Sequence, residues 1–110
     1  MYELKPVISA IVISLIFFGS VTAEEGAETR LLETNKCVEC DLTNAELEGA
    51  KLRRADFSGA YLYRANLEYA DLRGANFTGA DLSNARLRGA DLRNAIFNGA
   101  ILKYTKFGDA

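Results

Sequence analysis

The sequence lacks several residue types on which catalysis and metal binding commonly depend. Its 110 residues contain no His and no Trp, with one Pro and two Cys. Without His the chain has neither the commonest general base nor the commonest metal ligand. The formal net charge of -2 leaves no strong field to attract nucleic acid or an anionic membrane surface. These absences argue against most enzyme classes and against nucleic-acid binding, and we expect no cofactor.

Long hydrophobic runs are absent except near the start of the chain. Residues 7–18 are apolar, which is short for a membrane span, and a V-x-A site follows, ending at Ala23. This pattern predicts a cleaved secretory signal over residues 1–23. Because Glu3 offsets Lys5, the region before the run is weakly charged, and an uncleaved N-terminal anchor is the alternative. The rest of the chain is expected to be exported, to the periplasm or, in a photosynthetic host, the thylakoid lumen, without membrane contact after cleavage.

What the chain has in abundance is a five-residue repeat, which we call the word. It occurs fourteen times from Cys40 to Asp109, and its third residue, the centre, is Leu or Phe. Ala stands two residues before the centre in twelve of the fourteen words, and Gly or Asn stands two residues after it in nine. No helix accounts for this spacing, because five residues rotate the pattern by about 140° around a helix with 3.6 residues per turn. The centres are all Leu or Phe, at positions 42, 47, 52, 57, 62, 67, 72, 77, 82, 87, 92, 97, 102 and 107.

A very short strand followed by a turn accounts for the word. The Ala and the central Leu or Phe are two residues apart, so in a strand they point to the same side. The step to the next Ala is three residues, and the strand must therefore break there. Gly or Asn just before that Ala suits a turn with a positive φ. Successive turns of one hand would wind the chain into a coil whose apolar residues face the axis.

The tandem word A-[DN]-[LF]-x-x resembles the pentapeptide repeat family. The resemblance covers residues 40–110 and implies an all-β solenoid, a right-handed quadrilateral β-helix with four words in each twenty-residue coil. Fourteen words would make about three and a half coils. Phe57, Phe77 and Phe97 are twenty residues apart, so we expect them to form one aromatic column inside the helix. The resemblance supplies no catalytic motif.

Residues 24–39 precede the repeat and are expected to cap it. A β-helix has an open apolar end with unpaired strand edges, which invite association unless they are covered. Leu31 and Leu32 lie in a helix-compatible setting. We predict a short helix near residues 27–34 that lays one of these leucines over the first coil. A disordered linker is the alternative.

Cys37 and Cys40 are expected to be the first and fourth residues of the turn before the first regular word. The ends of such a turn lie within about 7 Å of each other, which permits a disulfide. A structural bridge is the favoured interpretation in an oxidising compartment. Two buried free thiols and a redox-active pair are the alternatives. Zinc is not expected, because one C-x-x-C without His or further Cys cannot supply four ligands.

Two outward surfaces are candidates for protein binding. Arg53, Arg73 and Arg93 fall twenty residues apart, and stacked guanidinium groups could clamp an anion or an acidic partner. A solvated ladder, in which neighbouring Asp residues relieve the Arg repulsion, is the alternative. Tyr61 and Tyr63 form the second surface, since exposed tyrosines bury much area with little entropy loss. The alternative is that their side chains simply shield the coil.

Two further features could align copies of the chain. One side carries Glu residues in its early words and Arg or Lys in its later ones, which could align two antiparallel copies or orient a partner. An ordinary mixed surface, which needs no special explanation, is the favoured interpretation. The far end departs from the word at Tyr104 and Phe107, and its apolar edge could join two copies as a homodimer through a coil end. The charged residues of that side are Glu46, Glu48, Glu68, Arg86, Arg88 and Lys106.

These features favour an exported structural or protein-interaction module without catalytic activity. A thiol-disulfide, redox-responsive protein using Cys37 and Cys40 is the alternative, although no βαβ setting and no base accompany the pair. A DNA-mimicking topoisomerase inhibitor, which some longer members of the family resemble, is disfavoured by the export signal, the charge near zero and the small number of coils.

Overall fold

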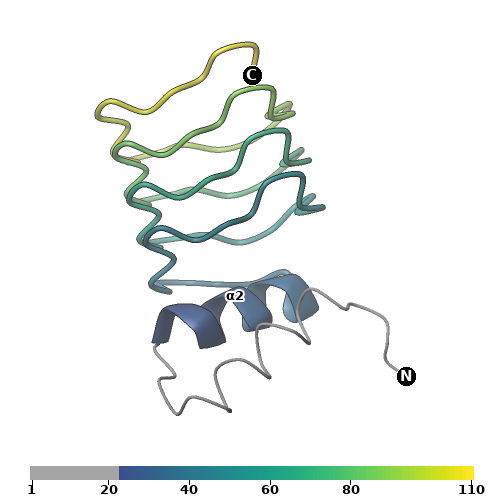
Figure 1. Ribbon diagram of the computed structural model, residues 1–110, viewed down its shortest axis with the longest axis vertical. Coiled ribbons are helices and arrows are strands. Elements are labelled where there is room, and N and C mark those ends of the chain that lie inside the picture. Colours follow the sequence, from purple (N-terminus) through teal and green to yellow (C-terminus); the bar gives the residue numbers. More distant parts are fainter. Residues whose placement is uncertain (1–22) are drawn as a thin grey trace.

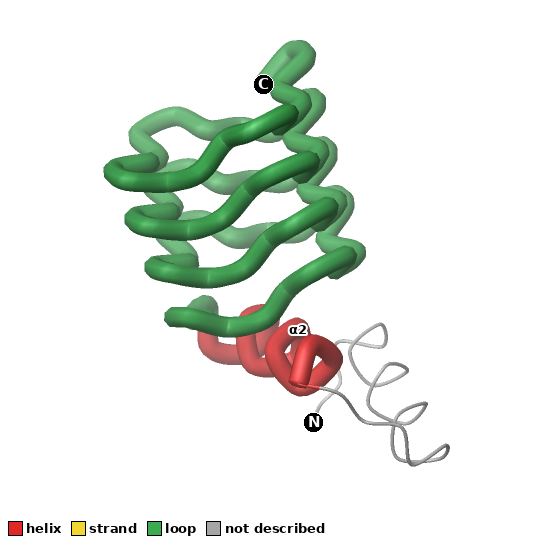
Figure 2. Tube along the Cα trace, turned by 90° about the vertical axis from the view of Figure 1, so that its left-hand side faces the viewer, coloured by secondary structure: helices red, strands yellow, loops and turns green. Residues whose placement is uncertain are grey.

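The computed structural model describes residues 23–110, so the predicted signal segment lies outside the described residues except for Ala23. One helix, α2 (Ala23–Thr34), precedes a stack of turns that continues to the end of the chain (Figure 1). Figure 2 shows the same arrangement from the side, with α2 lying across one end of the stack. The helix ends where predicted but begins earlier than residue 27. Within residues 23–110, no helix combines the length and the apolar character needed to cross a bilayer.

Backbone pairing joins residues that lie twenty positions apart. Eleven parallel bridges link the residues just before the word centres, as in the series Lys51, Asp71 and Asp91. The N–H of Leu62 donates to the carbonyl of Asp81 at 2.7 Å, and the N–H of Asp81 donates to the carbonyl of Ala60 at 2.9 Å. Each bridge is isolated, so the stacked turns never lengthen into extended strands.

The chain changes direction at the residue two positions after each word centre. All fourteen of these residues have a positive φ, between 59° and 72°. The turn is closed by a hydrogen bond such as that from the N–H of Ala60 to the carbonyl of Phe57, at 2.9 Å. The left-handed conformation therefore persists where the word lacks Gly or Asn. Those positions are Arg54, Arg64, Tyr69, Tyr104 and Asp109.

The interior holds the Ala, Leu and Phe of the word and little else. The rings of Phe57 and Phe77 are stacked with centroids 4.8 Å apart, and those of Phe77 and Phe97 are 5.0 Å apart. The predicted aromatic column is thus confirmed. Phe57 and Phe77 are fully buried, whereas Phe97 is partly exposed. The ring of Phe107 meets that of Phe97 edge-on, at 6.4 Å.

The end of α2 is fixed to the first turns by its own sequence. Asn35 follows the helix with a φ of 65° and donates its N–H to the carbonyl of Leu31 at 2.7 Å, which is the geometry of a left-handed C-cap. Its side-chain amide donates to the carbonyl of Arg53 at 2.8 Å. Leu31 is fully buried in the same cluster as the solenoid interior, and Leu32 is partly buried against it.

Candidate interaction surfaces

The two cysteines lie in the first turn, directly beside α2. Their sulfur atoms are at bonding distance and their Cα atoms are 5.2 Å apart. Both are buried, with exposed fractions of 1% for Cys37 and 4% for Cys40. The Sγ of Cys37 lies 3.5 Å from the carbonyl oxygen of Ala27, and the guanidinium of Arg30 contacts the Sγ of Cys40. The pair therefore holds the first turn against the helix. Sequence reasoning missed Arg30, because nothing in the linear order places it near Cys40.

Two members of the arginine column are paired with carboxylates. Arg73 donates from Nε and Nη2 to Asp71 at 2.8 and 2.6 Å, and Arg93 binds Asp91 in the same way at 2.9 and 2.6 Å. The hydrogen bond from Arg73 lowers the pKa of Asp71, and that from Arg93 lowers the pKa of Asp91 to about 2. Both carboxylates are thus charged at neutral pH, as the solvated-ladder interpretation expects.

Arg53 differs from the two arginines above it. The residue two positions before it is Lys51 instead of Asp, and no ion pair within 4.0 Å is found for Arg53 or Arg54 among residues 26–110. The column borders a groove of about 360 Å³. Sequence reasoning missed Arg54, although its place at a turn beside the column could have revealed it. The groove is lined by Arg53, Arg54, Arg73, Gly74, Arg93 and Asn94.

Tyr61 and Tyr63 lie on another side of the solenoid, with exposed fractions of 55% and 41%. The bridges place Tyr61 between Asp41 and Asp81, so the structure does not bring the tyrosines together with the arginine column. Two further tyrosines that the sequence reasoning did not select are also exposed, Tyr69 at 52% and Tyr104 at 70%. Both occupy the turn position two residues after a word centre.

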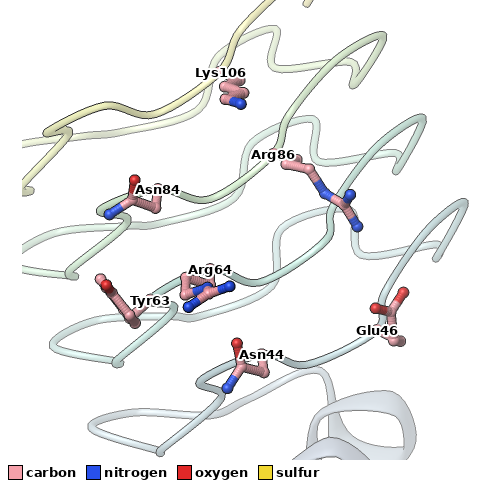
Figure 3. A pocket seen from close by; sticks show the side chains of 7 residues that line it. All are labelled: Asn44, Glu46, Tyr63, Arg64, Asn84, Arg86 and Lys106. Carbon is pink, nitrogen blue, oxygen red and sulfur yellow. The ribbon is translucent and has the colours of Figure 1, made fainter.

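Tyr63 also borders a second groove, of about 410 Å³, that crosses several successive turns (Figure 3). Glu46 lies near one end of this groove and Lys106 near the other, with Arg86 between them. No group of His, Cys, Asp or Glu among the residues that the structure describes could hold a metal ion. The groove is lined by Asn44, Glu46, Tyr63, Arg64, Asn84, Arg86 and Lys106.

Comparison with known proteins identifies the class. The family model for pentapeptide repeats, in eight copies, matches residues 40–79 and 75–110. The chain therefore belongs to the pentapeptide repeat family. No curated protein matched it.

Solved structures agree with this assignment. Rfr23, a pentapeptide repeat protein from the cyanobacterium Cyanothece 51142, is 36% identical with a TM-score of 0.66, and the match covers 67% of this chain but only 50% of Rfr23. The pentapeptide repeat protein alr5209 from Nostoc Pcc 7120 is 35% identical with a TM-score of 0.58, covering 73% of this chain and 70% of that one. AT2G44920, a pentapeptide repeat protein from the Arabidopsis thaliana thylakoid lumen, is 30% identical with a TM-score of 0.30, covering 84% and 69%. The fold is a right-handed β-helix solenoid.

Proposed function

We propose that this protein is an exported, non-catalytic interaction module that binds an acidic segment of a partner protein in the arginine-lined groove. The observation that carries the proposal is the positive charge in that groove that no carboxylate of the described residues pairs with. Arg73 and Arg93 have their own carboxylates, whereas Arg53 and Arg54 have none within ion-pair distance among residues 26–110. Two guanidinium groups at one end of the groove are therefore available to an incoming anion.

The chemistry of the groove favours carboxylates on an extended segment. A guanidinium offers two parallel N–H donors to a carboxylate, and such forked pairs are stronger than neutral hydrogen bonds. Arg73 and Arg93 already hold carboxylates in this way at 2.6 to 2.9 Å. Carboxylates of a partner would bind Arg53 and Arg54 as Asp71 and Asp91 bind Arg73 and Arg93. Tyr61 and Tyr63 offer a second, separate contact area on a different side of the solenoid.

The test is recovery of partners from the compartment in which the protein resides. We expect Arg53→Glu combined with Arg54→Glu to abolish recovery of the partner, because repulsion replaces the forked contacts. Lys36→Glu, an equal change of charge per residue at an exposed site on another side, should leave it unaltered. Tyr63→Ala tests the tyrosine surface independently. Equal recovery with all of these variants would contradict both surfaces.

Several finer features of the molecule belong to the same proposal. The apolar run over residues 7–18 and the V-x-A site support cleavage near Ala23 and export to the periplasm or the thylakoid lumen. The twenty-residue pairing supports about three and a half four-sided coils.

The burial of Leu31 supports a capping role for α2. If α2 caps the solenoid, Leu31→Glu should expose the apolar end and cause association. Because this association is hydrophobic, added salt should not weaken it. The edge near Leu102 and Phe107, 38% and 37% exposed, offers a place where two copies could join end to end.

A redox-responsive role for Cys37 and Cys40 is the second candidate. A positive charge beside a sulfur stabilises the thiolate and so favours the reduced state, and the contact between Arg30 and Cys40 supplies that charge. Thiol labelling before and after reduction, with measurement of the reduction potential, separates the roles. A potential below about -300 mV marks a structural bridge. Arg30→Gln should lower the potential if the guanidinium stabilises the thiolate.

A further inference from the structure

One side of the solenoid separates its charges along the axis. Bridges connect Glu46 to Asn66, Asn66 to Arg86, and Arg86 to Lys106, forming one ladder of four rungs. A second ladder, two residues further along each word, carries two acidic side chains and then one basic side chain. We call these two ladders the dipolar side. Its acidic half consists of Glu46, Glu48 and Glu68, and its basic half of Arg86, Arg88 and Lys106.

The side chains of the dipolar side are held in place before any partner arrives. Asn66 is only 6% exposed, and its amide donates to Oε1 of Glu46 at 3.0 Å. The backbone N–H of Glu68 donates to Oδ1 of the same Asn66 at 3.0 Å. Nε of Arg86 lies 3.7 Å from Oε2 of Glu68. Glu28, on α2, brings another carboxylate to the acidic end, where its Oε2 accepts from the backbone N–H of Glu46 at 3.2 Å.

Most of the charge at the two extremes has no ion-pair partner within the chain. Among residues 26–110, no ion pair within 4.0 Å is found for Glu46, Glu48, Arg88 or Lys106. Arg88 instead lies over the ring of Tyr69, 6.0 Å from its centroid. In Figure 3, Glu46 and Lys106 are well separated along the groove, with Arg86 between them. The two ends therefore present opposite, unneutralised charge to the solvent.

A two-fold axis can place the acidic half of one copy against the basic half of a second copy. When two such sides face each other about an axis that is parallel to the rungs and perpendicular to the solenoid axis, the first rung of one copy meets the fourth rung of the other. Glu46 then faces Lys106 of the other copy, and Glu68 faces its Arg88, each contact occurring twice. An axis parallel to the solenoid would instead place Glu46 against Glu48, and like charges would repel. Only the antiparallel pairing matches opposite charges.

The aromatic residue at this side lies where the antiparallel pairing needs it. Tyr69 is 52% exposed and belongs to the second rung. Its ring extends over Gly89 of the third rung, so close that a Cβ at Gly89 would lie 2.5 Å from the ring carbons. The ring is therefore at the level of the two-fold axis, between the second and third rungs. Tyrosines from two copies would approach each other there, and tyrosine is a preferred anchor at protein interfaces.

We propose that a second copy of this chain binds antiparallel on the dipolar side, through Glu46 with Lys106 and Glu68 with Arg88. A side four rungs high, about 19 Å at 4.8 Å per rung, and no wider than 24 Å, offers less than the area of about 800 Å² per partner of a standard interface. The dimer is therefore weak and depends on charge. Its residues differ from those of the arginine-lined groove, so partner binding and self-association can fail independently.

The test is a charge exchange between two variants, followed by analytical ultracentrifugation. The acidic variant carries Arg88→Glu and Lys106→Glu, and the basic variant carries Glu46→Lys and Glu68→Lys. Each variant alone places like charges at all four contacts, and we expect its self-association to weaken by more than about tenfold relative to the wild type. An equimolar mixture restores attraction at all four contacts and should form heterodimers. Because only folded chains can pair in this way, recovery in the mixture also excludes misfolding as the cause.

Salt and a matched control complete the experiment. Wild-type association should weaken by about tenfold or more between about 0.01 and 0.15 M salt, as the screening length falls from about 30 to 8 Å. Lys36→Glu with Lys103→Glu gives the same change in net charge as the acidic variant but lies on other sides, and should associate like the wild type. A monomeric wild type at low salt would overturn the proposal. So would variants that self-associate as the wild type does, which would place the contact at the coil end.

Discussion

At the residue scale, the turn position is where this chain departs most from the simplest form of its word. Gly and Asn enter the left-handed region at little cost, but Arg and Tyr do so at a cost of about 1–2 kcal/mol each. Arg54, Arg64 and Tyr69 nevertheless have φ near 60°. Their conformation is imposed by the pairing above and below them. A large side chain at these positions therefore costs stability. Arg54 borders the arginine-lined groove and Tyr69 borders the dipolar side, the two surfaces for which we propose roles.

The first prediction exchanges the residue at this position in both directions. Arg54→Gly should be neutral or stabilise the fold by up to about 1 kcal/mol, because relief of the left-handed strain exceeds the entropic cost of glycine. Gly79→Ala should destabilise it by about 1 kcal/mol, since Gly79 has a φ of 69° and only ordinary contacts around it. Urea denaturation measures both. Marked destabilisation by Arg54→Gly would show that the Arg54 side chain contributes more than the turn strain removes.

The second prediction concerns the ionisation of Asp91. Its pKa in the folded chain, about 2, is below the ordinary value of 3.8, mainly because Arg93 donates a hydrogen bond to it. The ion pair therefore favours the folded state above pH 3.8, and this contribution declines as the pH falls toward about 2. In Arg93→Gln, NMR titration should show the pKa of Asp91 moving up toward 3.8. The pKa of Asp56, which hydrogen bonds from Ser58 lower, serves as the control and should not change.

At the scale of elements, the single bridge is too short to be stable alone. Each word contributes one bridge and one turn, and its Ala and Leu or Phe are buried only because the neighbouring turns cover them. The stacked pairs Phe57–Phe77 and Phe77–Phe97 illustrate this dependence, since each ring closes the space above the previous one. Stability therefore comes from contacts between neighbouring turns, as in other repeat proteins.

The third prediction uses the aromatic column to measure that dependence. Phe77→Ala should destabilise the protein by about 3–5 kcal/mol, because the ring is fully buried between two others. Phe77→Leu should cost less than about 1.5 kcal/mol, since Leu fills the equivalent position in the other columns. Phe97→Ala is the matched control, and its partly exposed ring should cost less than that of Phe77. Equal losses at positions 77 and 97 would contradict the burial argument.

At the scale of the whole molecule, the sequence predicted what its period determines. The five-residue word led to the solenoid, the twenty-residue stacking and the Phe column, because each follows from which positions can share an interior. The helix boundary at Ala23 was not predicted, since a helix start depends on capping and docking as much as on apolar spacing. Arg30 beside Cys40, Arg54 in the groove and the exposure of Tyr69 were also missed. These placements depend on side-chain direction, which the period does not determine.

The last prediction tests the period directly by deletion. Removing residues 61–80 takes out four whole words, so Phe97 would follow Phe57 in the column and every ladder would keep its side. Removing residues 61–65 takes out one word and shifts all later residues by one word relative to the earlier ones. Leu82 would then stack on Phe57, and acidic and basic side chains would change their positions around the solenoid. Circular dichroism and urea denaturation compare the two.

We expect the longer deletion to fold cooperatively, with a smaller denaturant slope in proportion to the lost surface. We expect the shorter one to be less stable than the full chain by more than its lost word explains, because its Phe column is broken. If the five-residue deletion kept its stability better than the twenty-residue deletion, stacking between residues twenty apart would not be what specifies the register of the turns.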